Sequence, residues 1–291
     1  MKKTITLGLI ILFFIPHLTA QEVRTRAKKT SENKKVVEII DSTLILVPVE
    51  EQTGVVTSDE INKAGGEILT FLEDKDGNMY TTFEIAGKTW MTQNLSTTVF
   101  NDGSYIPEVP DNAKWTSLKE PAYCWYCNNP ESKGFYGALY NWYAVKTGKL
   151  CPAGWHVPTD AEWTGLEVYL QNNDFNYDGT VDADLDRVTK NKIAKSLASG
   201  IHWAESTVKG SVGNTDYQAY RNKSRFSALP AGYRKSSDGS FDGVTSSGFW
   251  WSSGESDAGN AWIRSLSEND ISVSRSNSAK TGGYSVRCIK D

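Results

Sequence analysis

The fold is decided around the stretch Cys151-Pro152-Ala153-Gly154-Trp155-His156-Val157-Pro158-Thr159-Asp160-Ala161-Glu162-Trp163. Thr159 and Glu162 have the spacing of a capping box, in which each side chain bonds the backbone N–H of the other residue. From Trp163 onwards, apolar residues recur at helical spacing, which predicts an amphipathic helix that buries one face. We therefore expect a helix that begins directly after Thr159.

The chain on both sides of this helix predicts short strands separated by turns. Asp76-Gly77 is a hairpin signal that joins a strand at 68–72 to one at 79–86. A second helix is expected at 189–199, with Gly200 as its C-terminal stop. Short strands with frequent turn residues favour an antiparallel sheet, so the fold class is α+β. The other expected strands are 89–95, 139–145, 226–229, 248–252, 261–266, 271–274 and 284–289.

The composition divides the chain into three parts. Residues 1–20 read as a signal peptide, because a charged start precedes an apolar run at 7–15 that is too short to span a bilayer. Residues 21–65 carry charge clusters and no aromatic residue, which predicts a stalk or loosely ordered arm. All 10 Trp and 13 Tyr lie at or beyond Tyr80. We therefore expect one globular domain over 66–291.

The signal-like leader predicts where the chain is located, and the charge balance limits which partners it is expected to bind. Export to the periplasm, the cell surface or the medium is expected, with no transmembrane segment in the mature chain. The chain has 31 Lys and Arg against 35 Asp and Glu, a net charge of −4. Nucleic-acid binders normally carry a basic excess, so a nucleic-acid partner is not expected.

The four cysteines allow three pairings in an oxidising compartment. Cys124 and Cys127 would lie about 10 Å apart on a straight strand, which is beyond disulfide reach. They can pair with each other only if the chain turns between them. From the residues alone, the pairing of Cys151 and Cys288 with these two stays open.

Several motifs along the chain resemble one bacterial family, the Fibrobacter succinogenes major paralogous domain. The resemblance covers about residues 70–291 in order and implies exported or surface proteins of Bacteroidetes-like bacteria, mostly without an assigned activity. The motifs are Asp76-Gly77-Asn78-Met79-Tyr80, Thr89-Trp90-Met91-Thr92-Gln93-Asn94-Leu95, Tyr136-Gly137-Ala138-Leu139-Tyr140-Asn141-Trp142, the stretch 151–160, Leu229-Pro230-Ala231-Gly232-Tyr233-Arg234, Trp250-Trp251-Ser252-Ser253 and Ser285-Val286-Arg287-Cys288.

A more distant likeness concerns the fold. The run 157–163, together with the closing residues 286–288, is similar to the pattern of formylglycine-generating-enzyme-like domains, which belong to the C-type-lectin-like superfamily. This resemblance implies two helices, a small twisted sheet with many short strands, and terminal strands that pair side by side. It also implies a disulfide between Cys151, near a helix, and Cys288, on the last strand.

Two classes of function follow. The first is a non-catalytic binding or adhesion module whose ligand is a glycan or a protein. The second is an exported enzyme related to the formylglycine-generating type, with an unidentified active site. Neither His156 nor His202 neighbours a plausible nucleophile, and we expect a hydrogen-bonded structural role for His156 and a packing role for His202. No catalytic residues are assigned, so the binding module is favoured.

One acidic loop resembles the front of a calcium-binding loop. Its candidate oxygen ligands are Asp174, Asn176, Asp178 and Asp182, with Gly179 at the turn. The twelfth position holds Leu185 instead of an acidic residue, so the alternative is a solvated acidic loop. Calcium is the only cofactor that the sequence suggests.

The C-terminal loops carry the candidate ligand contacts. Trp250 and Trp251 should face opposite sides of a strand, which leaves one of them a candidate for exposure. Polar residues on a rigid scaffold are how recognition surfaces are commonly built, although ordinary loop solubility is the simpler explanation of these residues. The candidate contacts are Ser253, Asn260, Trp262, Arg264, Asn269, Arg275 and Asn277.

Overall fold

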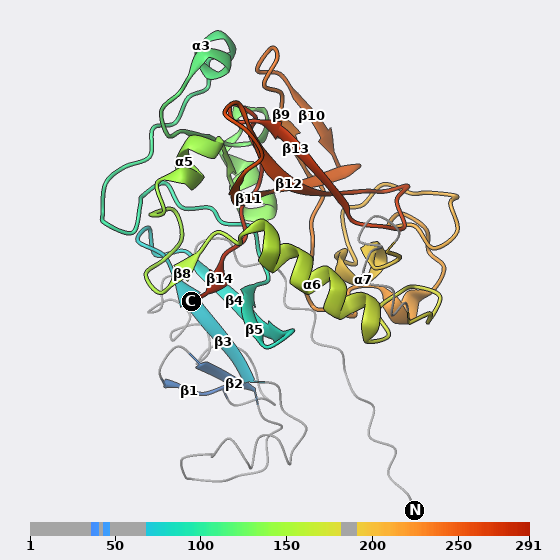
Figure 1. Ribbon diagram of the computed structural model, residues 1–291. Coiled ribbons are helices and arrows are strands. Elements are labelled where there is room, and N and C mark those ends of the chain that lie inside the picture. The colour runs from blue at the N-terminus through green and yellow to red at the C-terminus, as the bar shows by residue number, and fades with distance from the viewer. Residues whose placement is uncertain (1–35, 41–42, 47–67, 182–190) are drawn as a thin grey trace, which may run out of the picture.

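The computed structural model describes residues 36–40, 43–46, 68–181 and 191–291, which are coloured in Figure 1. The expected signal peptide at 1–20 and most of the expected arm at 21–65 lie outside these residues. The described part combines many strands with few helices, as the α+β class predicts. None of its helices is long and apolar enough to cross a membrane.

The first sheet of the described chain has seven strands in the order β1-β2-β3-β4-β5-β14-β8, and its neighbours pair antiparallel. The predicted hairpin is confirmed, because Leu72 on β3 faces Tyr80 on β4 and Gly77 turns the chain with φ +78°. Strand β14, at the end of the chain, lies between β5 and β8. The strands are β1 Val36–Ile40, β2 Thr43–Leu46, β3 Ile68–Glu73, β4 Met79–Ile85, β5 Lys88–Met91, β8 Trp155–His156 and β14 Ile289–Lys290.

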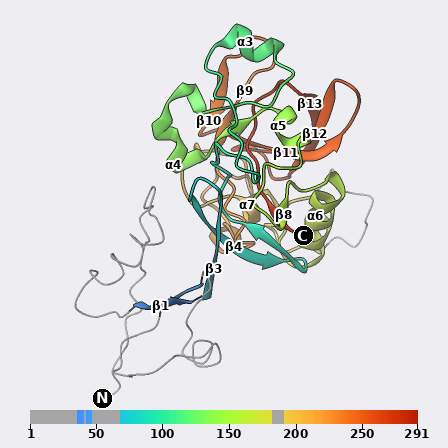
Figure 2. The same cartoon turned by 90° about the vertical axis from the view of Figure 1, so that its left-hand side faces the viewer.

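The second sheet has five strands in the order β10-β9-β11-β12-β13. All its neighbours are antiparallel except β9 and β11, which pair in parallel. Figures 1 and 2 show this sheet on the opposite side of the molecule from β3, β4 and β5. Its strands are β9 Ala231–Arg234, β10 Phe241–Val244, β11 Ser247–Glu255, β12 Asn260–Ser267 and β13 Ser274–Ala279, and a separate pair consists of β6 Tyr123–Cys124 and β7 Leu139–Tyr140.

Helix α6, Asp160–Asn172, is the predicted capped helix. Thr159 Oγ1 accepts from the backbone N–H of Glu162, and Glu162 Oε2 accepts from the backbone N–H of Thr159, so both halves of the capping box form. The apolar face starting at Trp163 is buried, as expected. The other described helical segments are short: α3 Asn112–Ser117, α4 Lys133–Tyr136, α5 Trp142–Lys146, α7 Ala194–Leu197 and the 3₁₀ turns Tyr126–Asn128, Pro130–Ser132 and Gln218–Tyr220.

Helix α6 lies between the two sheets in Figure 1 and closes a core with both of them. Phe226 is at the centre of this core, with its ring centroid 5.6 Å from that of Trp163 on α6. Its ring also lies 6.0 Å from Trp90 on β5 and 6.2 Å from Trp250 on β11. One aromatic cluster therefore joins the helix to both sheets.

Trp250 and Trp251 do face opposite sides of β11, as the alternation predicts. Trp250 joins the core under α6, whereas Trp251 packs in a second core and donates from Nε1 to the carbonyl of Tyr140 at 2.8 Å. Both rings are buried, so the expectation that one of them is exposed was wrong. The second sheet is covered on both faces at this strand.

The strand expected at 139–145 was wrong in its second half. Only Leu139–Tyr140 pairs as β7, and Trp142–Lys146 forms helix α5. The reason is Asn141, whose side-chain oxygen accepts from the backbone N–H of Ala144 and thereby caps a helix.

The second predicted helix is also shorter than the expected span 189–199. Residues 189 and 190 lie outside the described chain, and helix α7 covers only Ala194–Leu197. Its end is set by Ala198, which forms a bridge with Ala228, and this bridge is all that remains of the strand expected at 226–229. Strand β13 begins at Ser274 instead of 271, and the expected strand 284–289 is reduced to isolated bridges followed by β14.

Candidate functional site

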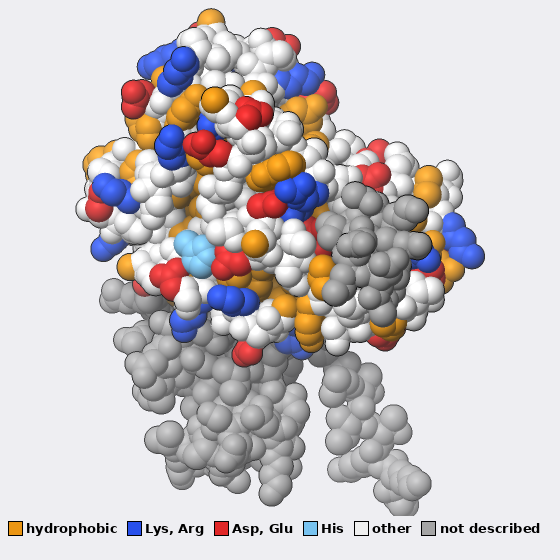
Figure 3. All heavy atoms as spheres, viewed as in Figure 1, with side chains coloured by type: hydrophobic (Ala, Val, Ile, Leu, Met, Phe, Trp, Pro, Cys, Tyr) orange, Lys and Arg blue, Asp and Glu red, His pale blue; other side chains and the backbone are white. Residues whose placement is uncertain are grey.

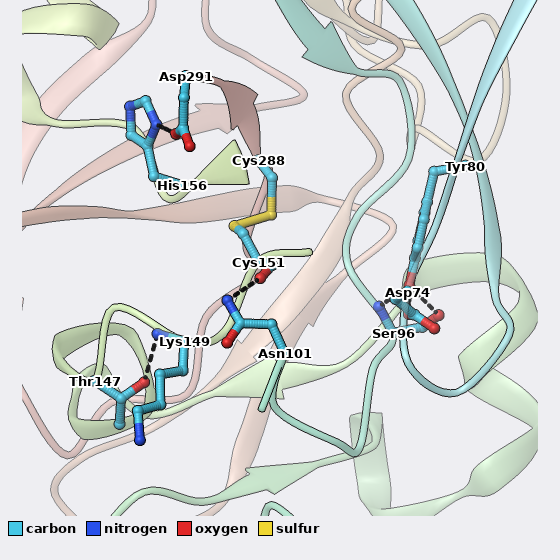
Figure 4. The surroundings of a disulfide bond; sticks show 10 residues. All are labelled: Asp74, Tyr80, Ser96, Asn101, Thr147, Lys149, Cys151, His156, Cys288 and Asp291. Carbon is cyan, nitrogen blue, oxygen red and sulfur yellow. Dashed lines mark hydrogen bonds and ion pairs between the residues drawn. A yellow bond between two sulfur atoms is a disulfide. The ribbon is translucent and has the colours of Figure 1, made fainter. Parts of the chain in front are cut away.

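The disulfide joins the segment that precedes α6 to the end of the chain. Cys151 and Cys288 are bonded with their Cα atoms 5.9 Å apart, which confirms the pairing implied by the likeness to formylglycine-generating-enzyme-like domains (Figure 4). Asn101 donates to the carbonyl of Cys151 at 3.0 Å and ties a third segment to the same place. The bridge fixes the position from which α6 starts.

The other two cysteines, both within the described chain, are free thiols. Cys124 is buried, and this burial raises the pKa of its thiol to about 12 against the opposing effect of the nearby Arg234. Its thiolate is therefore disfavoured at neutral pH. Cys127 is exposed in a left-handed turn with φ +53°. The chain does turn between them, but no bond forms.

His156 is held between two carboxylates beside the disulfide. Its Nδ1 lies 2.6 Å from Asp291 Oδ1 (Figure 4), and its Nε2 lies 3.0 Å from each carboxylate oxygen of Glu162. Burial lowers the pKa of the imidazole, but the hydrogen bonds to Asp291 and Glu162 outweigh it and raise the pKa overall. The hydrogen-bonded structural role expected for His156 fits this arrangement.

In the candidate calcium loop, lysines lie next to the acidic side chains. Asp174 Oδ2 lies 2.7 Å from Lys223 Nζ, and Asp178 Oδ2 lies 2.5 Å from Lys192 Nζ. Asn176 donates from its side-chain amide to the carbonyl of Thr180 at 2.6 Å. The remaining candidate, Asp182, lies outside the described residues. In the described part of the chain, no three His, Cys, Asp or Glu side chains gather in a way that could hold a metal ion.

Four of the candidate ligand contacts lie together on one face of β12 and β13. Trp262 is opposite Asn277, and Arg264 is opposite Arg275. Residues two apart on a strand share a face, so all four side chains start from the same side of the sheet. This is the side that α6 covers, because Trp250 of the helix-side core is opposite Arg264.

Arg264 is not at the surface, contrary to the expectation that it is a loop donor. It donates from Nε to Glu167, from Nη1 to Asp160 Oδ1 at 2.8 Å, and from Nη2 to Thr164 Oγ1 at 3.0 Å. All three acceptors are on α6. Its side chain is 1 % exposed, so this arginine joins the helix to the sheet instead of meeting a ligand.

Arg275, opposite Arg264 on the neighbouring strand, is closer to the surface and stacks on Trp262. The central carbon of its guanidinium lies 3.5 Å from the ring centroid of Trp262, which is van der Waals contact. Its Nε and Nη2 donate to the two oxygens of Asp160 at 2.9 and 2.8 Å. Burial raises the pKa of Asp160, but the bonds from Arg275 and Arg264 lower it overall.

A glycine of β11 completes this surface. A Cβ added to Gly254 would lie 3.6 Å from the ring of Trp262 and 3.7 Å from Asp160 Cβ. Neighbouring Ser253 donates from its backbone to the carbonyl of Pro158 at 2.9 Å, so β11 is tied to the start of α6. We call the set Asp160, Gly254, Trp262, Arg275 and Asn277 the Trp262 face.

Two further candidate contacts have other places in the structure: Asn260 bonds a neighbouring aspartate, and Asn269 lies away from the Trp262 face. Asn260 donates from its amide to both oxygens of Asp257. Asn269 follows the end of β12 and bonds Glu268, and its seven-residue separation from Trp262 corresponds to about 20 Å along a strand. The structure therefore does not bring Asn269 to the Trp262 face.

The sequence did not point to Asp160 or Gly254 as part of the site. Asp160 was recognised only as a first-turn residue of a capped helix, where a carboxylate is favourable in any case. Its second role depends on two arginines more than 100 residues away, at separations of 104 and 115 positions. A signal was present, because an acidic residue at a helix start and arginines in a strand pattern are ion-pair candidates.

Figure 3 shows the surface from the side on which α6 lies. Acidic and basic side chains alternate there with hydrophobic ones, and no large area carries one sign of charge. Away from this face, the ring of Phe135 is 50 % exposed, and its centroid lies 6.0 Å from that of His202. His202 also lies 6.1 Å from Tyr136, so its expected packing role is borne out at the surface instead of in the core.

The comparisons with known proteins identify the family. A family model of the Fibrobacter succinogenes major domain matches residues 83–290. The chain belongs to this family. No curated protein and no solved structure matches it.

Two arginines from the motifs of the Fibrobacter succinogenes major domain form part of its scaffold. Arg234 donates to the carbonyls of Val109, Pro110 and Gly239, and Arg287 donates to those of Met91, Phe226 and Ser227. Both side chains are fully buried. These motif residues hold distant segments together, whereas the Trp262 face lies outside the quoted motifs except for Asp160.

Proposed function

We propose that this chain is an exported, non-catalytic binding module of a Bacteroidetes-like bacterium, and that its Trp262 face binds a glycan. The observation that carries the proposal is the stacked pair of Trp262 and Arg275, which Asp160 holds in place from the first turn of α6. The pair combines an aromatic ring with a guanidinium that stacks over it and carries N–H donors. A saccharide offers the complementary combination of a C–H face and hydroxyl groups.

Rigidity supports this assignment. Each contact of the pair is anchored by a strand or by the helix, and Arg264 fixes Asp160 from below at 2.8 Å. Side chains that are already ordered lose less conformational entropy on binding than mobile ones do. Tryptophan and arginine are also the residue types that most often dominate binding energy.

A C-type-lectin-like architecture is part of the proposal. Its supports are the antiparallel sheets, the capped helix α6, and the pairing of β14, at the end of the chain, beside β5. Export is supported by the leader-like sequence at 1–20. Thiol-dependent catalysis at these positions is disfavoured for two reasons. The thiol of Cys124 is buried and protonated, and Cys151 and Cys288 are bonded to each other.

A glycan array probed with the full chain tests the proposal. We expect retained glycans whose affinity, measured by titration calorimetry, falls at least about fivefold in Trp262→Leu, because interface anchors are worth more than about 1 kcal/mol each. Asn277→Trp should block the same surface without disturbing the core, since Asn277 is exposed on an edge strand.

Phe135→Ala is the matched control, because it removes an exposed aromatic ring away from the Trp262 face. Melting temperatures of all three variants show that each is folded. If glycans bind and Phe135→Ala, but not Trp262→Leu or Asn277→Trp, loses affinity, the face is misassigned. If no glycan is retained by the folded chain, the proposed function is wrong.

A further inference from the structure

The guanidinium of Arg275 has one occupied edge and one open edge. Asp160 takes the edge formed by Nε and Nη2, in a bidentate geometry. An arginine carries five N–H donors in a planar fork, so the edge formed by Nη1 and Nη2 retains donors of its own. Within the described chain, no acceptor lies on Nη1, and the Arg275 side chain is 33 % exposed.

The direction of this open edge is fixed by its neighbours. The guanidinium plane lies against the ring of Trp262, with 3.5 Å between its carbon and the ring centroid. Asp160 cannot turn away with Arg275, because its Oδ1 also accepts from Arg264 Nη1 at 2.8 Å. A ligand therefore meets a fork that is already oriented, which is the condition under which bidentate bonds give specificity.

The open edge of the Arg275 fork favours an anionic partner, because charged donors bond an anionic acceptor more strongly than a neutral one. Asp160 is shared by two guanidiniums, and the second carboxylate of the cluster, Glu167, lies beneath the surface with 1 % exposure. Arg264 is equally buried and pairs with Glu167, so the surface carries one carboxylate, Asp160, beside one cation, Arg275. Arginine forks of this kind match carboxylates and phosphates in shape, and uronic acids carry a carboxylate attached directly to the sugar ring.

We infer that the ligand of the Trp262 face is a saccharide that contains a uronate, whose carboxylate pairs with Nη1 and Nη2 of Arg275. This inference rests on the proposed function. The sugar ring would lie beside Trp262, where its C–H face can pack against the remaining apolar surface. The amide of Asn277, opposite Trp262 on the neighbouring strand, lies on the same face for a hydroxyl.

Three probes of one stereochemistry test the inference: tri-galacturonate, its methyl ester and the neutral galactose trimer. Calorimetry with the full chain should show the acid binding at least about tenfold more tightly than the ester, because hydrogen bonds between charged groups are about twice as strong as neutral ones. Affinity for the acid should fall as salt is raised. Arg275→Lys, which keeps the charge but loses the fork, should lose most of the preference for the acid.

Lys235→Gln is the matched control. Lys235 is 34 % exposed and pairs with Asp242 at 3.0 Å near the opposite edge of the same sheet, so its loss should leave the preference unchanged. Equal binding of the acid, the ester and the neutral trimer would overturn the inference and leave the proposed function standing. Tighter binding of an aspartate-rich peptide at the same face would overturn it as well, in favour of a protein ligand. Absence of binding by any sugar would count against both.

Discussion

Arg264 on β12 and Glu167 on α6 form an ion pair inside the domain, and each side chain is 1 % exposed. The pair connects the longest described helix to β12, an inner strand of the second sheet. Burial raises the pKa of Glu167, although the charge of Arg264 opposes this, and its Oε2 has no hydrogen-bond partner in the described chain. The position of α6 on the sheet, and with it the arrangement of the Trp262 face, therefore depends on this buried ion pair.

Removing one partner of this pair should destabilise the domain strongly. We expect Arg264→Ala to lower the free energy of unfolding by about 3–5 kcal/mol, because it leaves the carboxylate of Glu167 buried without its counter-charge. Urea denaturation of the parent chain and the variant measures the difference.

Arg275→Ala is the control for this prediction. It also removes an arginine bonded to Asp160, but the pair is partly exposed, so the cost should stay near 1 kcal/mol or less. Replacing both partners, in Arg264→Met with Glu167→Leu, should recover much of the stability lost in Arg264→Ala. An equal cost for Arg264→Ala and Arg275→Ala would contradict the assignment of a buried structural role to Arg264.

The disulfide should contribute a large part of the stability. Cys151 and Cys288 are 137 positions apart, and closing a loop of this length is worth about 5 kcal/mol in the chain-entropy description. We therefore expect the variant with both cysteines replaced by alanine to lose several kcal/mol in urea denaturation. Cys127→Ser, which changes an exposed free thiol, should lose almost nothing. Non-reducing peptide mapping that finds Cys151 joined to Cys124 or Cys127 would show that the pairing is different.

The position of His156 between Glu162 and Asp291 predicts how the stability of the domain changes with pH, including the sign of the change. The pKa of His156 is raised in the folded chain above its ordinary value of 6.5. A raised histidine pKa gives stability that is complete below about pH 6.5 and is lost as the pH rises through the folded pKa. The ring is 35 % exposed, so the effect should stay below about 1 kcal/mol.

This dependence is measured as the difference in unfolding free energy between the parent chain and His156→Gln at pH 6 and pH 8. The difference should shrink from pH 6 to pH 8. Glu162 and Asp291 face the ring, and Lys88 lies 4.0 Å from Glu162. Burial raises the pKa of Glu162, but the hydrogen bonds from Thr159 and His156 lower it overall, so this carboxylate does not titrate over this range. A difference that grows with pH would mean that the ring is neutral in the folded chain.

The parts of the fold that the sequence predicted are those governed by local rules. The capping box of Thr159 and Glu162, the hairpin at Gly77 and the alternation at Trp250 and Trp251 each depend on residues within a few positions of one another. The strand expected at 139–145 failed for a local reason as well, because the cap made by Asn141 was overlooked.

The parts that the sequence did not predict depend on distant partners. Trp250 and Trp251 are both buried because sheet and helix cover the two faces of β11, which no alternation pattern reveals. Arg264 and Arg275 look alike in sequence, yet Arg264 is buried against α6 and Arg275 lies at the surface. What separates them is their place relative to Asp160, 104 and 115 positions earlier.

The acidic loop at 174–182 offers the last test. Calcium coordination by Asp174, Asn176, Asp178 and Asp182 predicts a melting temperature that rises in millimolar calcium, and Asp178→Ala should abolish the rise. We expect no rise in the parent chain, because Lys223 and Lys192 already lie 2.7 and 2.5 Å from the carboxylates of Asp174 and Asp178.

The ion pairs also lower the pKa of both carboxylates, for Asp174 through the hydrogen bonds from Lys223 and Tyr220, and for Asp178 against an opposing effect of burial. A calcium ion would have to displace two ammonium groups before it gained its ligands. Lys192→Met separates the two possibilities, since it removes one competing cation and leaves the carboxylates in place. If calcium then raises the melting temperature of Lys192→Met but not of the parent chain, the lysines are what keep the loop from binding the metal. A rise already present in the parent chain would show that the loop binds calcium in spite of the two lysines.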